Sequence, residues 1–357
     1  MDKIRLALIF GGQSSEHEVS CVSAATVVGI LDRDKYEITF IGITKDGHWI
    51  LVENEDEIAD RRWEEDIKSA ARAIISPDTN HKLIIKRGDA FELKSIDVAF
   101  PVLHGLFGED GTIQGLFEMA HIPYVGCGHL SSAITMDKFF TKIVADSIGV
   151  EQAKFVGVRA YEIKGDGMQK VVERIEAERE YPMFVKPSCA GSSKGITKAH
   201  NRDELIAGLK IAADNDSKIL VEESISGREI ECAVFGYGDD AFATGVGEIV
   251  AAAEFYDFDA KYNNEDSKTI VDPELPEGKR DEIREKALKI FKACDGFGFS
   301  RVDFFLENGT NRVVFNEINT IPGHTAISMY PMLMKAAGYD MADYVDKLIE
   351  MSYKRHE

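Results

Sequence analysis

Two segments near the C-terminal end carry acidic, amide and guanidinium side chains at the spacing of β-strands. Arg301 and Asp303 are two residues apart in one alternating segment, and Glu317 and Asn319 are two apart in the next. Side chains two apart lie on the same face of a strand. Their hard oxygen ligands suit Mg²⁺ or Mn²⁺ bridging the phosphates of ATP, and do not suit zinc. The alternative is an exposed hairpin face with a salt bridge, but four such side chains beside residues 320–323 favour a site.

A Gly/Ser loop at residues 190–195 is a second candidate for phosphate binding. Glycine lets backbone N–H groups point inward, and Ser192 and Ser193 add hydroxyl donors. The preceding strand carries Lys186, which can aim an ammonium group at the same phosphate. The loop does not have the Walker A spacing, and a strand follows where a helix would be required. A simple turn therefore stays open as the alternative.

Two further polar residues adjoin predicted strands or helices. His104 begins a glycine-rich segment, residues 104–111, at a strand end, where α/β proteins place ligands. It is either a general base or a structural hydrogen-bonding residue. Glu16 lies near a predicted helix N-terminus, where it either stabilises the helix or contacts a ligand. For both residues the sequence allows a functional role and a purely structural one.

Length and composition limit the class of protein. The chain has 357 residues, 44% of them hydrophobic, which is enough for two or three globular domains. Its formal charge of −20 argues against nucleic acid or an anionic membrane as the main partner. Five cysteines without a C-x-x-C pair suggest reduced thiols, and no apolar stretch approaches the ~18 residues of a membrane span. We therefore expect a cytoplasmic protein.

The first part of the chain has the pattern of an α/β unit with parallel strand pairing. Strands are predicted at 4–10, 38–43, 97–103 and 122–125. The capping-box pattern Ser15-x-x-Glu18 predicts a helix that begins there and runs to about residue 31. The acidic stretch 53–66 is predicted to be a solvated loop or helix face without chemistry.

From about residue 130 the pattern changes to short strands with long loops. One helix is predicted over 131–147, and strands at 184–186, 196–198, 218–223 and 228–235. Residues 251–275 are polar and irregular, as a lid or binding loop would be. A helix is predicted over 277–294, and Asn308-Gly309 predicts a hairpin between strands 300–306 and 312–318. Helical patterns close the chain at 327–352.

Several motifs together resemble those of the D-alanine–D-alanine ligases of the ATP-grasp superfamily, essentially from end to end. They are Gly11-Gly-x-Ser-x-Glu-x-Glu-Val-Ser20, His104-Gly-x-x-Gly-Glu-Asp-Gly-x-x-Gln-Gly115, Met136-Asp-Lys138, Val185-Lys-Pro, Gly191-Ser-Ser, Ala260-Lys-Tyr262, Arg301-Val-Asp303, Asn316-Glu-Ile-Asn-Thr-x-Pro-Gly323 and Ser328-Met-Tyr-Pro331. The histidine-containing segment and the Arg-x-Asp…Glu-x-Asn pair are very specific in combination.

The resemblance implies an N-terminal parallel α/β domain, residues 1–126, followed by a two-domain α+β ATP-grasp fold. The small central domain would cover 127–221, and the C-terminal domain, with the metal hairpin and lid loop, 222–357. The implied reaction joins two D-alanine molecules through a D-alanyl phosphate, with ATP and two Mg²⁺ or Mn²⁺ ions, for peptidoglycan precursors. A cytoplasmic homodimer is also implied.

The resemblance also implies a role for each matching residue. ATP would be bound by Lys138, Lys186, Ser193, Glu222, Glu223, Ile225, Glu229, Phe255 and Lys261, and the metals by Asp303, Glu317 and Asn319. Glu16 would bind the ammonium group of the first D-alanine, and Ser192 and Tyr262 would link the lid to the substrate site. Arg301 and the Gly323 N–H would form an oxyanion hole. The substrates would also contact His104, Ser328, which would hold the second carboxylate, and Met329.

Three positions depart from the family pattern: Lys194, Ser224 and His324, where small apolar, bulky and larger apolar residues are usual. Tyr262 favours an amine acceptor, and Met329 offers no hydrogen bond to a hydroxyl, which favours D-alanine over D-serine. His324 is the residue that could reverse that preference. The alternatives are a D-alanine–D-serine or D-lactate ligase, or a nucleotide-binding regulator without turnover. The intact Arg301, Asp303, Glu317 and Asn319 argue against the regulator.

Overall fold

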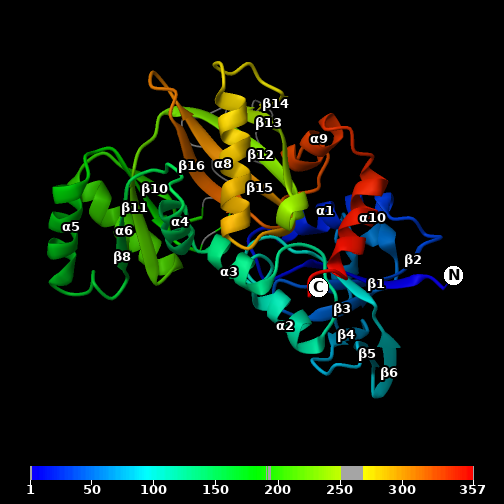
Figure 1. Cartoon of the computed structure of the whole chain (residues 1–357). Helices are drawn as coiled ribbons and strands as arrows, with labels where there is room; N and C mark the ends of the chain where they lie inside the picture. Colours follow the sequence, from blue (N-terminus) through cyan, green and yellow to red (C-terminus); the bar gives the residue numbers. More distant parts are fainter. Residues whose placement is uncertain (1, 190, 192–193, 251–267, 357) are drawn as a thin grey trace.

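The computed structural model describes residues 2–189, 191, 194–250 and 268–356, and they form three β-sheets with helices packed on them (Figure 1). The first sheet has seven strands in the order β6-β5-β4-β3-β2-β1-β7. These strands are β1 (Ile4–Gly11), β2 (Tyr36–Ile43), β3 (Trp49–Val52), β4 (Arg72–Ile75), β5 (Lys82–Arg87), β6 (Ala90–Ser95) and β7 (Val98–Val102).

The predicted parallel unit is confirmed: β1 pairs in parallel with β2 and with β7, and helix α1 (His17–Ile30) connects β1 to β2. Strands β3 to β6 extend the sheet by antiparallel pairing, which the sequence interpretation did not predict. The turn before α1 requires glycine, because Gly11 has a φ of 83° and a Cβ there would lie 2.3 Å from the carbonyl oxygen of Ile43.

Two predictions for this part are wrong. The capping box does not form: α1 begins at His17, and Glu16 precedes it without a side-chain capping bond. Residues 122–125 are not a strand, because only Tyr124 makes a single bridge to Ala99. The acidic stretch is largely exposed, as predicted, and contains two short 3₁₀ helices, Glu55–Glu57 and Arg62–Glu64, but the side chains of Ile58 and Trp63 are buried.

The second sheet is four-stranded and antiparallel, in the order β10-β9-β11-β8. Its strands are β8 (Phe155–Arg159), β9 (Met183–Pro187), β10 (Thr197–Ala199) and β11 (Lys218–Glu223). Helices α5 (Gly167–Glu178) and α6 (Arg202–Asn215) cover it and close a small apolar core. The strand–loop–strand prediction around residues 190–195 is thereby confirmed.

The helices that lead into this sheet are α2 (Thr112–Ala120), α3 (His129–Met136) and α4 (Lys138–Ser147). The single helix predicted over 131–147 is therefore two helices. Asp137 separates them, because its extended backbone ends α3 and its carboxylate accepts the N–H groups of Phe139 and Phe140 as the N-cap of α4.

The third sheet has the order β14-β13-β12-β15-β16. Its strands are β12 (Gly227–Tyr237), β13 (Phe242–Val250), β14 (Lys268–Val271), β15 (Phe297–Glu307) and β16 (Val313–Asn319). Helix α8 (Lys279–Ala293) runs across this sheet and buries its apolar side chains there (Figure 1). The irregular segment predicted over 251–275 is partly wrong, since β14 lies within it; residues 251–267 are outside the described residues.

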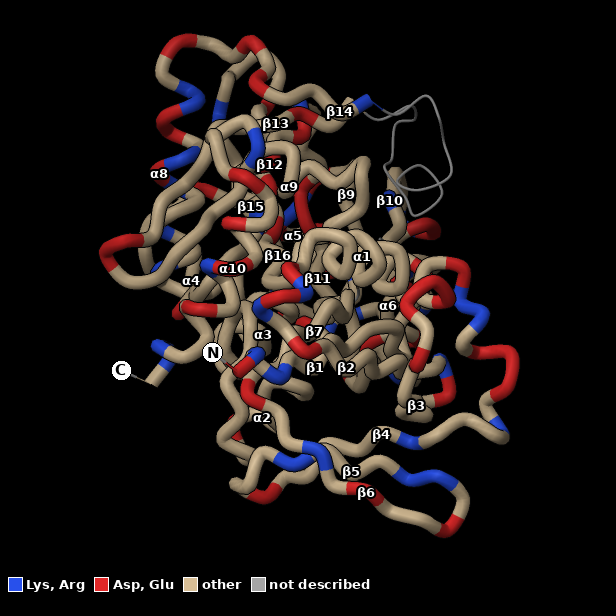
Figure 2. Tube along the Cα trace, turned by 90° about the vertical axis from the view of Figure 1, so that its right-hand side faces the viewer, with Lys and Arg blue, Asp and Glu red and all other residues tan. Residues whose placement is uncertain are grey.

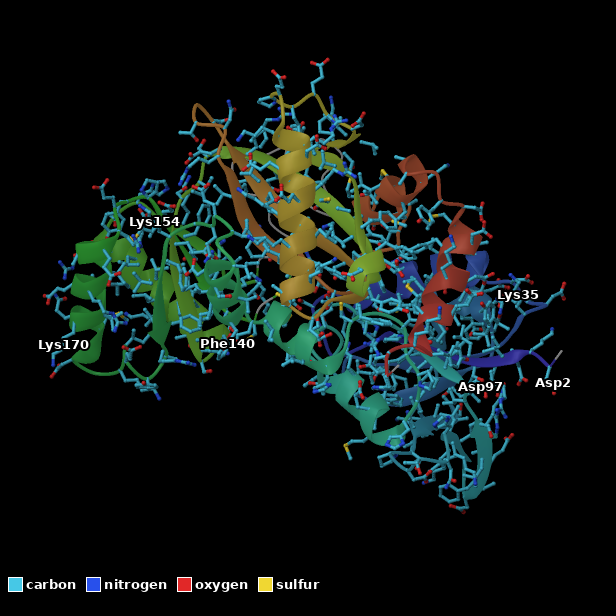
Figure 3. The ribbon with its side chains drawn as sticks, viewed as in Figure 1. Asp2, Lys35, Asp97, Phe140, Lys154 and Lys170 are labelled. Carbon is cyan, nitrogen blue, oxygen red and sulfur yellow. The ribbon has the colours of Figure 1, made fainter. Side chains whose placement is uncertain are left out.

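The last two helices, α9 (Met329–Ala336) and α10 (Met341–Ser352), join the first and third sheets. Phe10 of β1, Phe299 of β15, and Tyr330 and Tyr344 of these helices share one buried core. At its edge, Tyr36 donates to Asp346 of α10 over 2.8 Å. The preceding residue, Lys35, is labelled in Figure 3. The three-domain division at 126 and 221 stays a prediction, but each sheet falls largely within one of its parts.

Acidic and basic residues are spread along the whole Cα trace, with both signs interspersed (Figure 2). Among the described residues, no helix is both long and apolar enough to span a membrane.

Candidate active site

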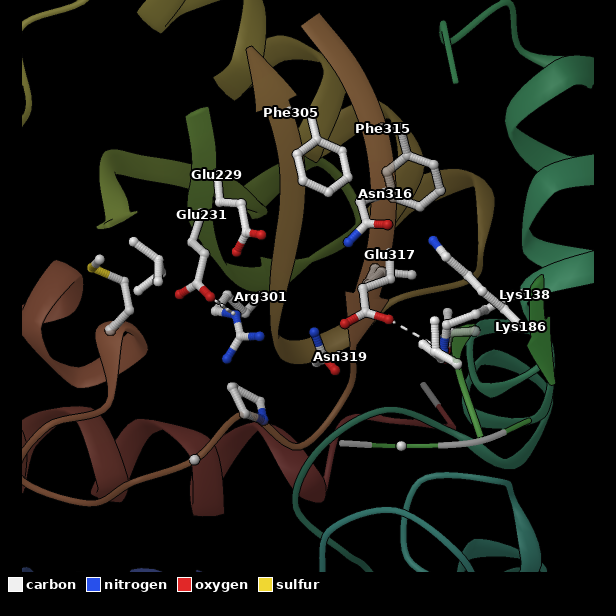
Figure 4. A pocket seen from close by; sticks show the side chains of 18 of the residues that line it. Lys138, Lys186, Glu229, Glu231, Arg301, Phe305, Phe315, Asn316, Glu317 and Asn319 are labelled. Carbon is white, nitrogen blue, oxygen red and sulfur yellow. Dashed lines mark ion pairs between the residues drawn. The ribbon is translucent and has the colours of Figure 1, made fainter. Parts of the chain in front are cut away.

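A cleft of about 380 Å³ lies where the three sheets meet, and most of the described candidate residues line it (Figure 4). The first sheet and its loops contribute Glu16 and His104, and the second contributes Lys186. The third contributes the hairpin of β15 and β16. Residues far apart in the sequence, such as Glu16 and Asn319, are thus brought to one cavity.

The hairpin presents its polar side chains as the sequence predicts. Arg301 lies opposite Asn319, and Asp303 lies opposite Glu317. The register then shifts, so that Phe304 pairs with Phe315 and leaves Asn316 as an extra residue. This bulge is needed, because strict alternation would place Phe315 on the same face as Glu317. Instead both phenylalanines are buried in the core under α8.

Arg301 is held between two carboxylates. Its Nε and Nη2 donate to the two oxygens of Asp303 over 2.8 and 2.7 Å, and Nε is 3.2 Å from Glu231 Oε1. Burial works against the charge of the guanidinium, but Asp303 and Glu231 outweigh it and raise the pKa of Arg301 well above its usual value. Glu231 was not a candidate from the sequence.

The donor set of the hairpin fits a hard divalent cation. Asp303 and Glu317 supply carboxylate oxygens, and Asn319, whose amide N–H donates to Asp303 over 3.0 Å, has an amide oxygen as well. Among the described residues, no three His, Cys, Asp or Glu side chains gather as a metal site.

Two lysines line the cleft together with the hairpin, and each is paired with a carboxylate. Lys138, the first residue of α4, is 3.2 Å from Glu317, and Lys186 of β9 is 2.7 Å from Glu222 (Figure 4 shows both lysines). Burial opposes the charge of Lys138, but Glu317 outweighs it and raises its pKa. The N–H of Lys138 donates to the carbonyl of Ser188 over 3.0 Å, which fixes α4 against the strand that carries Lys186.

The sequence interpretation missed a third lysine, Lys142. It is buried and lies 3.1 Å from the second oxygen of Glu222. Burial raises the pKa of Glu222, but Lys142 and Lys186 outweigh it and hold that pKa at about 2. A helical lysine spaced four residues after Lys138 has an ordinary surface pattern, so nothing local marks it as buried.

We expect Lys142→Met to weaken ATP binding by roughly 10-fold, because Glu222 would then compete for the charge of Lys186. Isothermal titration calorimetry with ATP would measure this. The double variant Lys142→Met/Glu222→Gln removes the competing carboxylate and should recover part of the lost affinity. An unchanged affinity in the single variant would contradict the expectation.

Glu16 also lines the cleft and lies against two glycines. A Cβ at Gly105 or at Gly191 would be 2.6 Å from Glu16 Oε2, so both positions need glycine for this carboxylate to fit. His104 and Glu109 line the same cleft. The carboxylate therefore occupies a narrow recess between the first sheet and the loop that follows β9.

His104 has a structural role in this recess. Its Nδ1 is 2.8 Å from the carbonyl oxygen of Ile321, and its Nε2 is 3.1 Å from Ser23 Oγ. Burial lowers the pKa of His104. Of the two sequence interpretations, the geometry favours the structural one, because both ring nitrogens already have partners.

Glu109, which the sequence interpretation did not single out, holds the same loop. Its two oxygens accept the N–H groups of Gly105, over 2.9 Å, and Ile321, over 2.8 Å. Burial raises the pKa of Glu109 to about 8, and the charge of Glu16 acts in the same direction. Glu109 and His104 together fix the backbone two residues before Gly323.

Gly323, Ser328 and Met329 line the same cleft as Arg301. Ser328 Oγ is 3.1 Å from the N–H of Thr325 and 2.8 Å from its hydroxyl. His324 does not line the cleft: it is buried, with Nδ1 2.8 Å from the Pro322 carbonyl oxygen and Nε2 3.2 Å from the Tyr344 hydroxyl. Burial lowers the pKa of His324 to about 4. It therefore offers no hydrogen bond to a substrate.

The remaining candidates divide into two groups. The cleft is also lined by the segment that follows β11 and by the start of β12, namely Glu222, Glu223, Ser224, Ile225 and Glu229. Five candidates lie outside the described residues, namely Ser192, Ser193, Phe255, Lys261 and Tyr262.

Lys194 is exposed and is not among the residues that line the cleft. We therefore expect Lys194→Val to leave the affinity for ATP unchanged at low ionic strength, where an electrostatic contribution would be largest. Calorimetric titrations at low and high salt would check this. A loss of affinity that shrinks with added salt would contradict it.

The comparisons agree with this geometry. Family models described as D-ala D-ala ligase N-terminus and C-terminus match residues 5–127 and 144–350. D-alanine–D-alanine ligases of Acetivibrio thermocellus and Caldicellulosiruptor bescii are 48% and 45% identical, over 99% and 100% of this chain and 97% of each relative.

Solved structures of the same family have this fold. The VanG D-Ala:D-Ser ligase of Enterococcus faecalis has a TM-score of 0.88 at 38% identity, over 98% of this chain and 100% of that chain. The D-alanine–D-alanine ligase of Coxiella burnetii has a TM-score of 0.85 at 33% identity, over 100% of this chain and 95% of that chain. The fold and the cleft are those of an ATP-grasp enzyme. The chain belongs to the D-alanine–D-alanine ligase family.

Proposed function

We propose that this protein uses ATP to join two D-alanine molecules into D-alanyl-D-alanine, a precursor of peptidoglycan. The observation that carries the proposal is one cleft that is lined by Arg301, Glu317 and Asn319 of the hairpin, by Lys138 and Lys186, and by Glu16. The lysines and the hard ligands of the hairpin are what phosphoryl transfer needs. The carboxylate of Glu16 provides an anionic recess that suits an ammonium group.

The reaction proceeds in two steps, because a carboxylate is a poor acyl donor. The carboxylate oxygen of the first D-alanine attacks the γ-phosphorus of ATP, which gives D-alanyl phosphate and releases ADP. The amine of the second D-alanine then attacks the acyl carbon, loses a proton, and expels inorganic phosphate. The new bond is a C–N peptide bond.

The role proposed for each side chain is the one that the family resemblance implies, and its place on the cleft supports it. Lys138 and Lys186 neutralise the phosphates of ATP, and Glu229, with the segment from Glu222 to Ile225, borders its adenosine part. Arg301 and the N–H of Gly323 stabilise the oxyanion that forms when the amine attacks. Glu16 binds the first ammonium, Ser328 the second carboxylate, and Met329 borders the second methyl group.

Two Mg²⁺ or Mn²⁺ ions fit the donors of Asp303, Glu317 and Asn319. Bound there with ATP, they would supply charge neutralisation for the transferring phosphoryl group. Loop residues Ser192, Ser193, Phe255, Lys261 and Tyr262 are proposed from the family resemblance to complete the ATP site and the lid. Such a lid would keep water from the acyl phosphate.

The test is product identification. The enzyme is incubated with ATP, Mg²⁺ and equal concentrations of D-alanine, D-serine and D-lactate, and the products are analysed by mass spectrometry. We expect mainly D-alanyl-D-alanine, with phosphate released only when D-alanine is present. A main product with D-serine, which the VanG neighbour uses, would overturn the choice of acceptor. No D-alanine-dependent phosphate release would overturn the enzyme proposal itself.

The choice of an amine acceptor rests on Tyr262. We expect Tyr262→Phe to gain D-lactate use relative to the parent, because the phenol oxygen that holds an amine in register is lost. Competition assays with D-alanine and D-lactate would measure the product ratio. A ratio equal to that of the parent would contradict this role.

We also propose that the enzyme works in the cytoplasm as a homodimer, without a nucleic-acid or membrane partner. All five cysteines are free thiols, which suits a reducing compartment. The net charge of −20 disfavours polyanionic partners. The dimer rests on the family resemblance alone, and sedimentation velocity would test it.

A further inference from the structure

The residue after Glu16, His17, has a completely buried ring with a partner at each nitrogen. Its Nδ1 is 2.8 Å from the carbonyl oxygen of Gly12, and its Nε2 is 2.6 Å from Glu64 Oε1. Glu64 comes from the acidic stretch to which the sequence interpretation assigned no chemistry. The contact joins positions 47 residues apart.

Both partners of this ring are acceptors. A peptide carbonyl has no hydrogen to donate, and neither has an ionised carboxylate. A neutral imidazole has one N–H, so the lone pair of its other nitrogen would face an oxygen lone pair at hydrogen-bond distance. A ring with hydrogen on both nitrogens satisfies both contacts. The geometry therefore indicates an imidazolium with Glu64 as its counter-charge.

The next acidic residue of α1, Glu18, is already paired. It has ion pairs with Lys45 and with Arg61, the latter over 3.1 Å. Trp63 stacks on the His17 ring, at 6.1 Å between ring centroids. A Cβ at Gly11 would be 3.0 Å from the ring carbon Cε1 of His17. A cation at a helix N-terminus is unfavourable, so the charge of Glu64 is needed there.

This ring connects to the substrate recess through the loop that carries Glu16. The bond from His17 to Gly12 closes residues 12–17 across the turn before α1. The N–H of Glu16 donates to Ser14 Oγ over 3.0 Å, within the same loop. Glu16 extends into the cleft, and His17, the next residue, extends to Glu64.

We propose that His17 is a positioning residue that sets the loop of Glu16 for the first substrate, and that it does so as an imidazolium paired with Glu64. The inference rests on the proposed role of Glu16 in binding the ammonium group. The inference adds that a buried cation, the His17 imidazolium, positions the loop that carries the carboxylate of Glu16.

Two substitutions of His17 test the requirement for charge. His17→Arg keeps a cation with several donors, whereas His17→Gln has a donor and an acceptor but no charge. We expect His17→Gln to lower kcat/KM for D-alanine by roughly 10-fold with the KM for ATP within about 2-fold of the parent, and His17→Arg to recover most of the loss. Equal or better activity in His17→Gln would overturn the inference.

Glu64→Gln should cause a similar selective loss for D-alanine, whereas the matched control Glu65→Gln, at the exposed neighbouring residue, should not. A Glu64→Gln variant with parental kcat/KM would contradict the role of Glu64. Thermal unfolding of each variant separates loss of fold from loss of positioning.

A spectroscopic measurement answers the question even if the variants fail to fold. In ¹⁵N-histidine-labelled wild-type protein under the conditions of the activity assay, we expect one imidazole with both nitrogens protonated. If this imidazole is His17, its signal disappears in His17→Arg. If that variant does not fold, the signal is expected to shift when Glu64 is replaced. No doubly protonated ring would overturn the inference. A wild type that makes no dipeptide would instead overturn the proposed function, while the NMR result would stand.

Discussion

Replacement of Glu317 by Gln is expected to lower turnover at saturating Mg²⁺ by at least ~10²-fold, or about 3 kcal/mol of transition-state stabilisation. The substitution keeps the size of the side chain but removes one of the two negative ligands of the hairpin. It also removes the counter-charge of Lys138, which lies 3.2 Å away. Steady-state phosphate release with D-alanine measures the effect.

The hairpin itself offers a matched control. Glu307, at the far end of β15, accepts two bonds from Arg312 and does not line the cleft. Glu307→Gln removes the same charge from the same pair of strands, so a general effect on the hairpin would appear in both variants. We expect Glu307→Gln to keep parental turnover. Near-parental turnover in Glu317→Gln would refute the metal assignment.

Arg301→Lys should lower kcat by roughly 10²- to 10³-fold, the usual cost of removing an oxyanion donor. Lysine keeps the charge but lacks the planar fork that donates to both oxygens of Asp303. The affinity for ATP should change much less, because Arg301 is proposed to act on the tetrahedral intermediate. Rapid-quench measurement of each step would locate the loss after formation of the acyl phosphate.

Arg312→Lys is the corresponding control, because Arg312 forms the same forked pair with Glu307 outside the cleft. It should cost stability of at most about 1 kcal/mol, as exposed ion pairs usually do, and no activity. If Arg301→Lys slows only formation of the acyl phosphate, Arg301 acts on the metal site through Asp303 and the oxyanion assignment is wrong.

Local patterns predicted much of the fold, because they act within one element. The parallel β1–α1–β2 unit, β11 and the hairpin of β15 and β16 all follow from the alternation and turn signals of their own residues. Prediction failed where contacts between distant elements decide where a helix begins or ends. The break at Asp137 depends on the residue that follows β9, since the Ser188 hydroxyl donates to the Asp137 carboxylate over 2.5 Å.

The sequence by itself determined the hairpin of Arg301, Asp303, Glu317 and Asn319, because strand alternation and family motifs both lie within short segments. Only the tertiary structure revealed the partners of other residues in and near the cleft. Glu231 pairs with Arg301, Lys142 pairs with Glu222, Glu109 accepts the N–H of Ile321, and Glu64 contacts the His17 ring. The tertiary structure also decided that His324 faces an aromatic core and not the substrate. The physical reason is that a buried charge is specified by its partner, and each of these partners comes from an element distant in sequence, so no local pattern records it.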